Sequence, residues 1–202
     1  LGCRTSRYCK HNQYVCEYLR QYFGLKAYKW CLNVVCQYCN LCGMCDGEDQ
    51  SLDATTEQRK LCVEEHNKLR RLHRDTQPLE WDFMLALKAQ RYARYLTNTI
   101  NLEHDADGEN LFVKMGSNGT TQWTCHSATM AWYNEIKHFD SKTLKSTNNQ
   151  SVMHFEQVVW KSAERIGVGI AYHKKLKFVY LVARYDQTIM AGEEKDNVMP
   201  VY

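Results

Sequence analysis

The cysteines of this 202-residue chain are concentrated at one end. Eight of the ten lie within the first 45 residues, at Cys3, Cys9, Cys16, Cys31, Cys36, Cys39, Cys42 and Cys45. A segment this short cannot bury enough apolar surface to fold on a core alone, and disulfides are the usual substitute in oxidising compartments. The pattern predicts a disulfide-stapled module at residues 1–46 and an extracellular, secreted protein.

The spacing inside this module leaves a second interpretation open. Cys36, Cys39, Cys42 and Cys45 follow one another at three-residue steps, and CxxC spacing also occurs in zinc sites. A zinc site prefers two separated pairs, so disulfides are the favoured interpretation. The sequence cannot choose among the many pairings that eight cysteines allow.

The module also carries a basic surface with aromatic side chains. Residues 1–46 hold six Lys or Arg against two acids, whereas the whole chain has a net charge of only +3. That total is too small to indicate a nucleic-acid partner. Lys26, Tyr28 and Lys29 place cations beside aromatics, which favours an ion channel, a receptor or another anionic partner. The alternative is a solvent-facing loop.

After a polar linker at residues 47–54, residues 55–202 have the pattern of one α+β domain. Helices are expected from Thr55, from Asp82, over 122–137 and over 154–160, and strands over 109–113, 166–172 and 178–185. The last two strands are apolar on both faces, which predicts a sheet covered on both sides, a three-layer α-β-α sandwich. Since no apolar run approaches the ~20 residues that span a bilayer, no transmembrane segment is expected.

Four ionisable residues of this domain stand in segments that could converge: His104, Glu109, Glu135 and His154. Two imidazoles and two carboxylates can hold a divalent cation such as Zn2+, with water in the open positions, or transfer protons. The alternative is a buried hydrogen-bonded network that only stabilises the fold.

Five short motifs resemble those of the CAP superfamily, which comprises cysteine-rich secretory proteins, antigen 5 and pathogenesis-related proteins. They are Glu64–Arg70, Asp107–Leu111, Trp132–Glu135, His154–Trp160 and Tyr180–Tyr185. The resemblance implies the three-layer CAP fold, and it matches the four ionisable residues to the family's cavity tetrad, with His104 and His154 as ligands of zinc or a related cation. It also implies a lipid or sterol ligand, and a non-enzymatic protein is the favoured interpretation.

Two smaller predictions concern the remaining cysteines and the glycosylation sequons. Cys62 and Cys125 either pair with each other or tether the small module. The sequons at Asn118 and Asn149 predict N-glycosylation of a secreted protein.

For the remaining candidate sites, an interpretation without a binding or catalytic role is favoured. A basic run at Arg70, Arg71, His73 and Arg74 could bind a sulfated glycan, although a solvated helix face is the favoured interpretation. A hydrolase is disfavoured because Ser127 and Ser151 lack a nucleophile elbow.

Overall fold

The computed structural model describes residues 51–115, 121–173 and 175–202. The chain divides into two compact units, Leu1–Asp49 and Gln50–Tyr202. The first unit lies outside the described residues, as do its eight cysteines, Lys26, Tyr28 and Lys29, and so does Asn118. What the sequence predicts for them stays a prediction.

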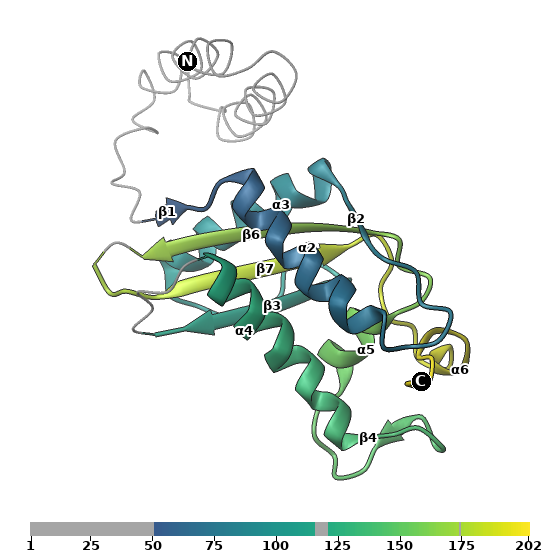
Figure 1. Cartoon of the computed structure of the whole chain (residues 1–202). Coiled ribbons are helices and arrows are strands. Elements are labelled where there is room, and N and C mark those ends of the chain that lie inside the picture. The colour runs from purple at the N-terminus through teal and green to yellow at the C-terminus, as the bar shows by residue number, and fades with distance from the viewer. Residues whose placement is uncertain (1–50, 116–120, 174) are drawn as a thin grey trace, which may run out of the picture. The chain divides into compact units, whose positions relative to one another are not determined.

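The larger unit is built on a five-stranded sheet (Figure 1). Its antiparallel centre is β6 (Arg165–His173) with β7 (Val179–Tyr185), and β3 (Glu109–Lys114) forms the edge beside β7. On the other side, β6 pairs with β1 (Ser51–Asp53) and, in parallel, with β2 (Glu80–Trp81). The strand β1 falls in the segment 47–54 that the sequence interpretation assigned to a linker, because three residues are too short to show strand periodicity.

Helices cover both faces of this sheet, which confirms the predicted three-layer sandwich. Figure 1 shows α2 (Thr56–Arg70) and α4 (Thr121–Tyr133) in front of the sheet and α3 (Phe83–Thr99) behind it. The helix α5 (Met153–Val159) lies on the side of α2 and α4, where Phe155 and Val158 share one core cluster with Val168 and Ile170. A second cluster joins α3 to the opposite face.

The contact between α3 and β6 requires two glycines. A Cβ on Gly167 would lie 1.9 Å from the Ala86 nitrogen, and one on Gly169 would lie 2.3 Å from the Ala89 carbonyl carbon. No side chain fits at either position, so the missing Cβ atoms let the helix backbone pack directly on the strand.

The helix starts follow the residues that the sequence indicates. Thr55 accepts a hydrogen bond from the Gln58 N–H, and Gln58 reciprocates in a capping box. Asp82 caps α3 by accepting from the Leu85 N–H at 2.8 Å. The predicted helix over 122–137 is interrupted, because α4 gives way to the 3-10 turn η1 (Asn134–His138). A short hairpin, β4 (Phe139–Asp140) with β5 (Lys145–Ser146), and the terminal helix α6 (Glu194–Asn197) complete the domain.

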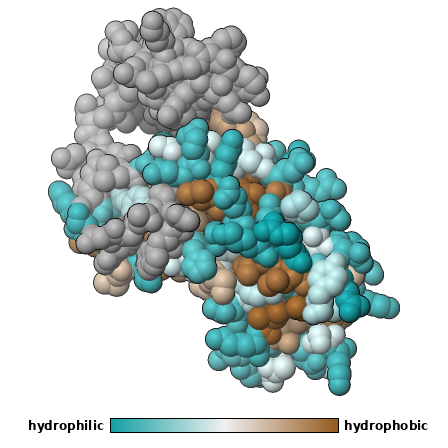
Figure 2. Space-filling model, viewed as in Figure 1, coloured by the Kyte–Doolittle hydropathy of each residue, from teal (hydrophilic) through white to brown (hydrophobic). Residues whose placement is uncertain are grey.

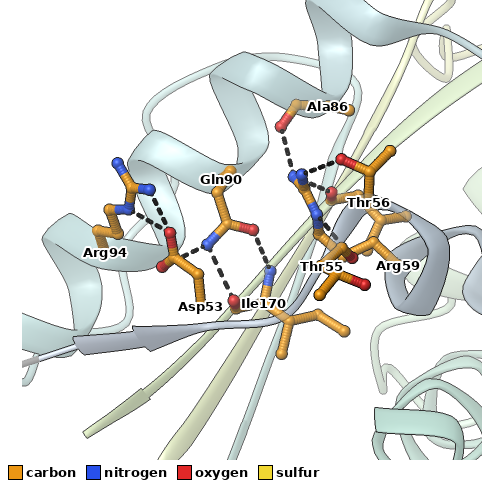
Figure 3. Close-up of polar contacts among 9 residues, drawn as sticks. Asp53, Thr55, Thr56, Arg59, Ala86, Gln90, Arg94 and Ile170 are labelled. Carbon is orange, nitrogen blue, oxygen red and sulfur yellow. Dashed lines mark hydrogen bonds and ion pairs between the residues drawn. The ribbon is translucent and has the colours of Figure 1, made fainter. Parts of the chain in front are cut away.

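Side chains bond backbone groups along part of the outer edge of β6. Between the short partners β1 and β2, the side-chain amide of Gln90 bonds both the N–H and the carbonyl of Ile170, each at 2.9 Å. Arg59 donates to the Val168 carbonyl at 3.1 Å, and Asp53 connects Gln90 to Arg94 (Figure 3). These contacts satisfy the Ile170 N–H and the Val168 carbonyl, and they give the Ile170 carbonyl a second donor beside the Ala54 N–H.

A disulfide joins Cys62 of α2 to Cys125 of α4, and both cysteines are fully buried. This pairing settles one alternative of the sequence interpretation, since neither cysteine tethers the N-terminal module. Within the described ranges, none of the helices combines the length and apolar character that a membrane crossing requires.

The basic run at the end of α2 is not a single surface, which contradicts both a glycan site made of all four residues and the solvated helix face that the sequence favoured. Arg70 is fully buried and donates to the carbonyls of Gln77, Val158, Trp160 and Ala163 at 2.8–3.1 Å. His73 is also buried, between the Met199 carbonyl and the Tyr133 hydroxyl. Only Arg71 and Arg74 of that run are exposed.

Candidate functional site

The four predicted tetrad residues meet at the edge strand β3. His104 lies in the irregular segment between α3 and β3, Glu109 begins β3, Glu135 lies in η1 and His154 is in the first turn of α5. The rings of His104 and His154 are stacked, with centroids 6.4 Å apart and planes inclined by 27°. The site therefore joins the α3 layer to the α5 layer around the edge of the sheet.

His154 is held tightly by Glu135. The His154 ring donates from Nδ1 to Glu135 Oε1 at 2.7 Å, and the backbone N–H groups of His154 and Phe155 donate to Oε2 at 3.0 and 3.2 Å. Val152 at the N-cap of α5 provides no side-chain cap. The carboxylate from η1 supplies this cap from a distance, and it orients the imidazole at the same time.

His104 is held more loosely by Glu109. Its Nδ1 lies 3.2 Å from Glu109 Oε1, and half of its side chain is exposed, whereas the Glu109 carboxylate is fully buried. Burial, followed by the charge of His154, lowers the pKa of His104. Burial also raises the pKa of Glu109, and the neighbouring Arg184 opposes that shift.

Arg184 of β7 is a member of this site that the sequence interpretation missed. It lies directly opposite Glu109 across the strand pair, and its Nε and Nη2 bond Glu109 Oε2 at 3.0 and 2.8 Å. The same guanidinium pairs with Asp105 and lies over the Tyr92 ring, 5.4 Å from its centroid. The pairing register of β3 and β7 is the signal that could have found it.

A buried chain of hydrogen-bonded polar groups connects α2 to the site. His66 Nδ1 lies 2.6 Å from the Cys62 carbonyl, and its Nε2 lies 2.8 Å from the Tyr185 hydroxyl. Burial lowers the pKa of His66 to about 4, so the neutral ring donates to the carbonyl and accepts from the hydroxyl. Asn110 donates both to the Tyr185 hydroxyl and, at 3.1 Å, to the His154 carbonyl, which ties this chain to α5.

Among the described residues, the hydrogen bonds of the two tetrad histidines use Nδ1, and Nε2 of each ring has no hydrogen-bond partner there. A carboxylate only accepts hydrogen bonds, so each Nδ1 bears the proton and each Nε2 keeps a lone pair. Carboxylates orient metal-ligating histidines in the same way. Two imidazoles on one tetrahedral zinc ion have ring centroids roughly 5 Å apart, about 1 Å closer than here. Within residues 51–115, 121–173 and 175–202, no group of three or more His, Cys, Asp or Glu could hold a metal ion. Two histidine nitrogens are therefore the most that this site offers a cation in the described residues, and at 6.4 Å their rings are farther apart than one ion requires.

The remaining candidates lie outside this site. Asn149 is exposed, in a left-handed backbone conformation at φ 59°. Ser151 accepts from the Met153 N–H at 3.4 Å. In the part of the chain that the structure describes, neither Ser127 nor Ser151 forms a hydrogen bond with a histidine.

Comparison with known proteins gives a consistent family assignment. The family described as CAP, the cysteine-rich secretory protein family, matches residues 63–185. Protein PRY2 of Saccharomyces cerevisiae is 37% identical over 142 residues, which cover 69% of this chain and 40% of that protein. Human cysteine-rich secretory protein 3 is 32% identical over 146 residues, which cover 64% of this chain and 56% of that protein. The chain thus spans about half the length of these relatives.

Solved structures share the fold. BmVAL-1 superposes with a TM-score of 0.53 at 23% identity, covering 67% of this chain and 79% of that one. The crystal structure of NaASP2 with Zn2+ gives a TM-score of 0.52 at 18% identity, covering 69% and 82%. These likenesses agree with the sandwich, and the family match extends over more than half of the sequence. The chain therefore belongs to the CAP, or cysteine-rich secretory protein, family.

Proposed function

We propose that this chain is a secreted, non-enzymatic CAP protein that binds a divalent cation, with zinc as the first candidate, through His104 and His154. The observation that carries the proposal is the pairing of each Nδ1 with its own carboxylate, which leaves two Nε2 lone pairs on neighbouring, stacked rings. A structure that shares the fold contains Zn2+, which makes zinc the natural first probe.

The positions of the carboxylates favour binding over catalysis. Glu135 uses both oxygens to hold the His154 ring and the start of α5. Glu109 is divided between His104 and Arg184. Both carboxylates therefore orient other groups, whereas a general base must reach the proton of a substrate. A hydrolase would require turnover that disappears in Glu135→Gln.

Calorimetric titration of the chelator-treated protein with zinc tests the proposal. We expect saturable binding that falls at least about tenfold in the His104→Ala/His154→Ala double variant. His126→Ala is the matched control, because His126 also pairs one carboxylate, Glu65, at 2.9 Å, and its contacts among the described residues include no other histidine. Equal heats for the wild type and the double variant would remove the site.

An apolar ligand, a lipid or a sterol, is a second proposal for the same domain. Figure 2 shows hydrophobic surface over the layer of α2, α4 and α5, interrupted by hydrophilic side chains. Among the described residues, partly buried Leu61, Leu69 and Ile136 pack at this layer beside the core. Titration with radiolabelled sterol and fatty acid checks it, and no saturable binding of either would reject it.

The N-terminal module supports a separate proposal, an interaction with an ion channel or receptor through Lys26, Tyr28 and Lys29. It rests on the cationic and aromatic pattern of residues 1–46. Voltage-clamp recording with the whole oxidised protein is the test, and a Lys26→Ala/Lys29→Ala variant of equal potency would exclude this surface. Intact-mass measurement before and after glycosidase treatment checks the proposed glycans at Asn118 and Asn149.

A further inference from the structure

The segment that carries His104 depends on few contacts for its position. Residues 101–107 are all exposed and belong to no helix or strand. In the described part of the chain, the contacts that attach this segment to the rest of the domain include the ring contact of His104 with His154 and three polar ones. His104 contacts Glu109, Asp105 pairs with Arg184, and the Tyr92 hydroxyl donates to the Glu103 carbonyl.

Arg184 takes part in two of these three polar attachments, directly or through Glu109. Its guanidinium is nine-tenths buried and bonds Glu109 Oε2 through two nitrogens, while one of them also pairs with Asp105. With Oε2 of Glu109 occupied in this way, Oε1 remains for His104 Nδ1. The planar fork of arginine allows one side chain to bond two carboxylates, which the single ammonium of lysine does less well.

We infer that Arg184 is a positioning residue for His104, because it fixes both the carboxylate that orients the ring and the main chain on which the ring stands. The inference builds on the proposed cation site, since His104 is one of its two ligands. His154 needs no such residue, because Glu135 and the buried chain from Asn110 hold it independently. Arg184 therefore controls one arm of the site and leaves the other unchanged.

The first test needs no metal. Imidazole 15N shifts report which ring nitrogen is protonated, and hydrogen exchange reports the opening of residues 101–107. In Arg184→Lys we expect the Nδ1-protonated signature to weaken for His104 and persist for His154, with exchange several-fold faster in the segment. Arg165→Lys is the control, because Arg165 also pairs two carboxylates, Asp82 and Asp186, away from the site.

The second test adds zinc to the same proteins. We expect Arg184→Lys to weaken zinc binding about tenfold, and Arg165→Lys to bind like the wild type. Unchanged exchange and an unchanged His104 signature in Arg184→Lys would overturn the inference, as would equal zinc affinity. If the wild type binds no zinc, the proposed function fails, and the metal-free measurements still decide the role of Arg184.

A milder variant covers the case in which Arg184→Lys does not fold. Asp105→Asn, at an exposed carboxylate, weakens the attachment of the segment and retains the buried pair of Arg184 with Glu109. We expect faster exchange in residues 101–107 with an unchanged α5. Exchange equal to that of the wild type would overturn the inference by itself.

Discussion

The two halves of the tetrad have the same chemistry and very different support. His154 and Glu135 make a 2.7 Å contact on elements that pack in the core, and their neighbours Phe155 and Val158 are almost completely buried. His104 and Glu109 make a 3.2 Å contact, with His104 on an exposed irregular segment. We call the pair of His154 and Glu135 the fixed half of the site and the pair of His104 and Glu109 the adjustable half.

This difference bears on the proposed cation site. A cation held by both histidines would need the rings closer than the present 6.4 Å, and the His104 arm is the one that stands on exposed, irregular backbone. Ordering of that arm would then reduce the net affinity, as it does for any segment that becomes fixed on binding.

The largest effect is expected from Arg70→Met, which acts on the fixed half. Three buried carbonyls, those of Val158, Trp160 and Ala163, would lose their donor, as would the part-buried Gln77 carbonyl. We expect the free energy of unfolding to fall by about 5 kcal/mol, since each unpaired buried group costs roughly 1–3 kcal/mol. Urea unfolding is the measurement, with the exposed neighbour variant Arg71→Met as control. A loss below about 1 kcal/mol would show that α5 does not depend on this arginine.

Arg70 also marks the limit of what the sequence could predict. The caps at Thr55 and Asp82 and the apolar run of β7 predict their elements because local hydrogen bonds and alternation decide them. Arg70 stands among surface arginines, and its burial depends on carbonyls 88 to 93 residues away. No local pattern encodes that contact.

The site shows the same division. The motif resemblance named all four tetrad residues, because their types and order are present in the sequence. Arg184 was missed because its role comes from the register of β3 on β7. Glu135 was expected on a helix and lies in a 3-10 turn, from which it can cap α5.

Glu156→Gln tests whether ionisation of a buried carboxyl in α5, the helix of the fixed half, lowers the stability of the folded protein. Glu156 is buried in α5, and burial, then Glu194 and Glu135, raise its pKa to about 7 from an ordinary 4.5. Below pH 4.5 the carboxyl is protonated in both states and contributes nothing. Above it the unfolded state ionises first, so the folded state loses relative stability until about pH 7. We expect the variant to match the wild type near pH 4.5 and to be more stable by about 2 kcal/mol at pH 8.

Urea unfolding of both proteins at the two pH values measures this difference. His66 has the opposite pH dependence, because its lowered pKa destabilises the folded state as the pH falls below 6.5. That contribution is common to both proteins and cancels in the comparison. Exposed Glu164→Gln is the control, and equal stability of Glu156→Gln and the wild type at pH 8 would contradict the prediction.

Glu135→Gln removes the charge and one hydrogen-bond acceptor from the fixed half and keeps the size of the side chain. The amide oxygen can still accept from the His154 and Phe155 N–H groups, but the amide nitrogen would donate to His154 Nδ1 and move the ring proton to Nε2. We expect a loss of about 1 kcal/mol in unfolding free energy and the loss of zinc binding. Imidazole 15N shifts check the tautomer, with Glu80→Gln as control. An unchanged His154 tautomer would show that Glu135 does not set it.

The smallest effect is expected at the start of the adjustable segment. Ile100 ends α3 at φ 52°, a left-handed conformation that a β-branched residue adopts at a cost, and its side chain is half exposed. Ile100→Gly removes that cost and adds backbone freedom to the unfolded chain, so we expect a net gain of about 0.5 kcal/mol. Thermal unfolding is the measurement, and Leu102→Gly, at an exposed position with no positive φ, is the control that should lose stability. If Ile100→Gly is destabilised as much as Leu102→Gly, the apolar contacts of Ile100 outweigh its strain, and the segment that carries His104 is better anchored than its exposure indicates.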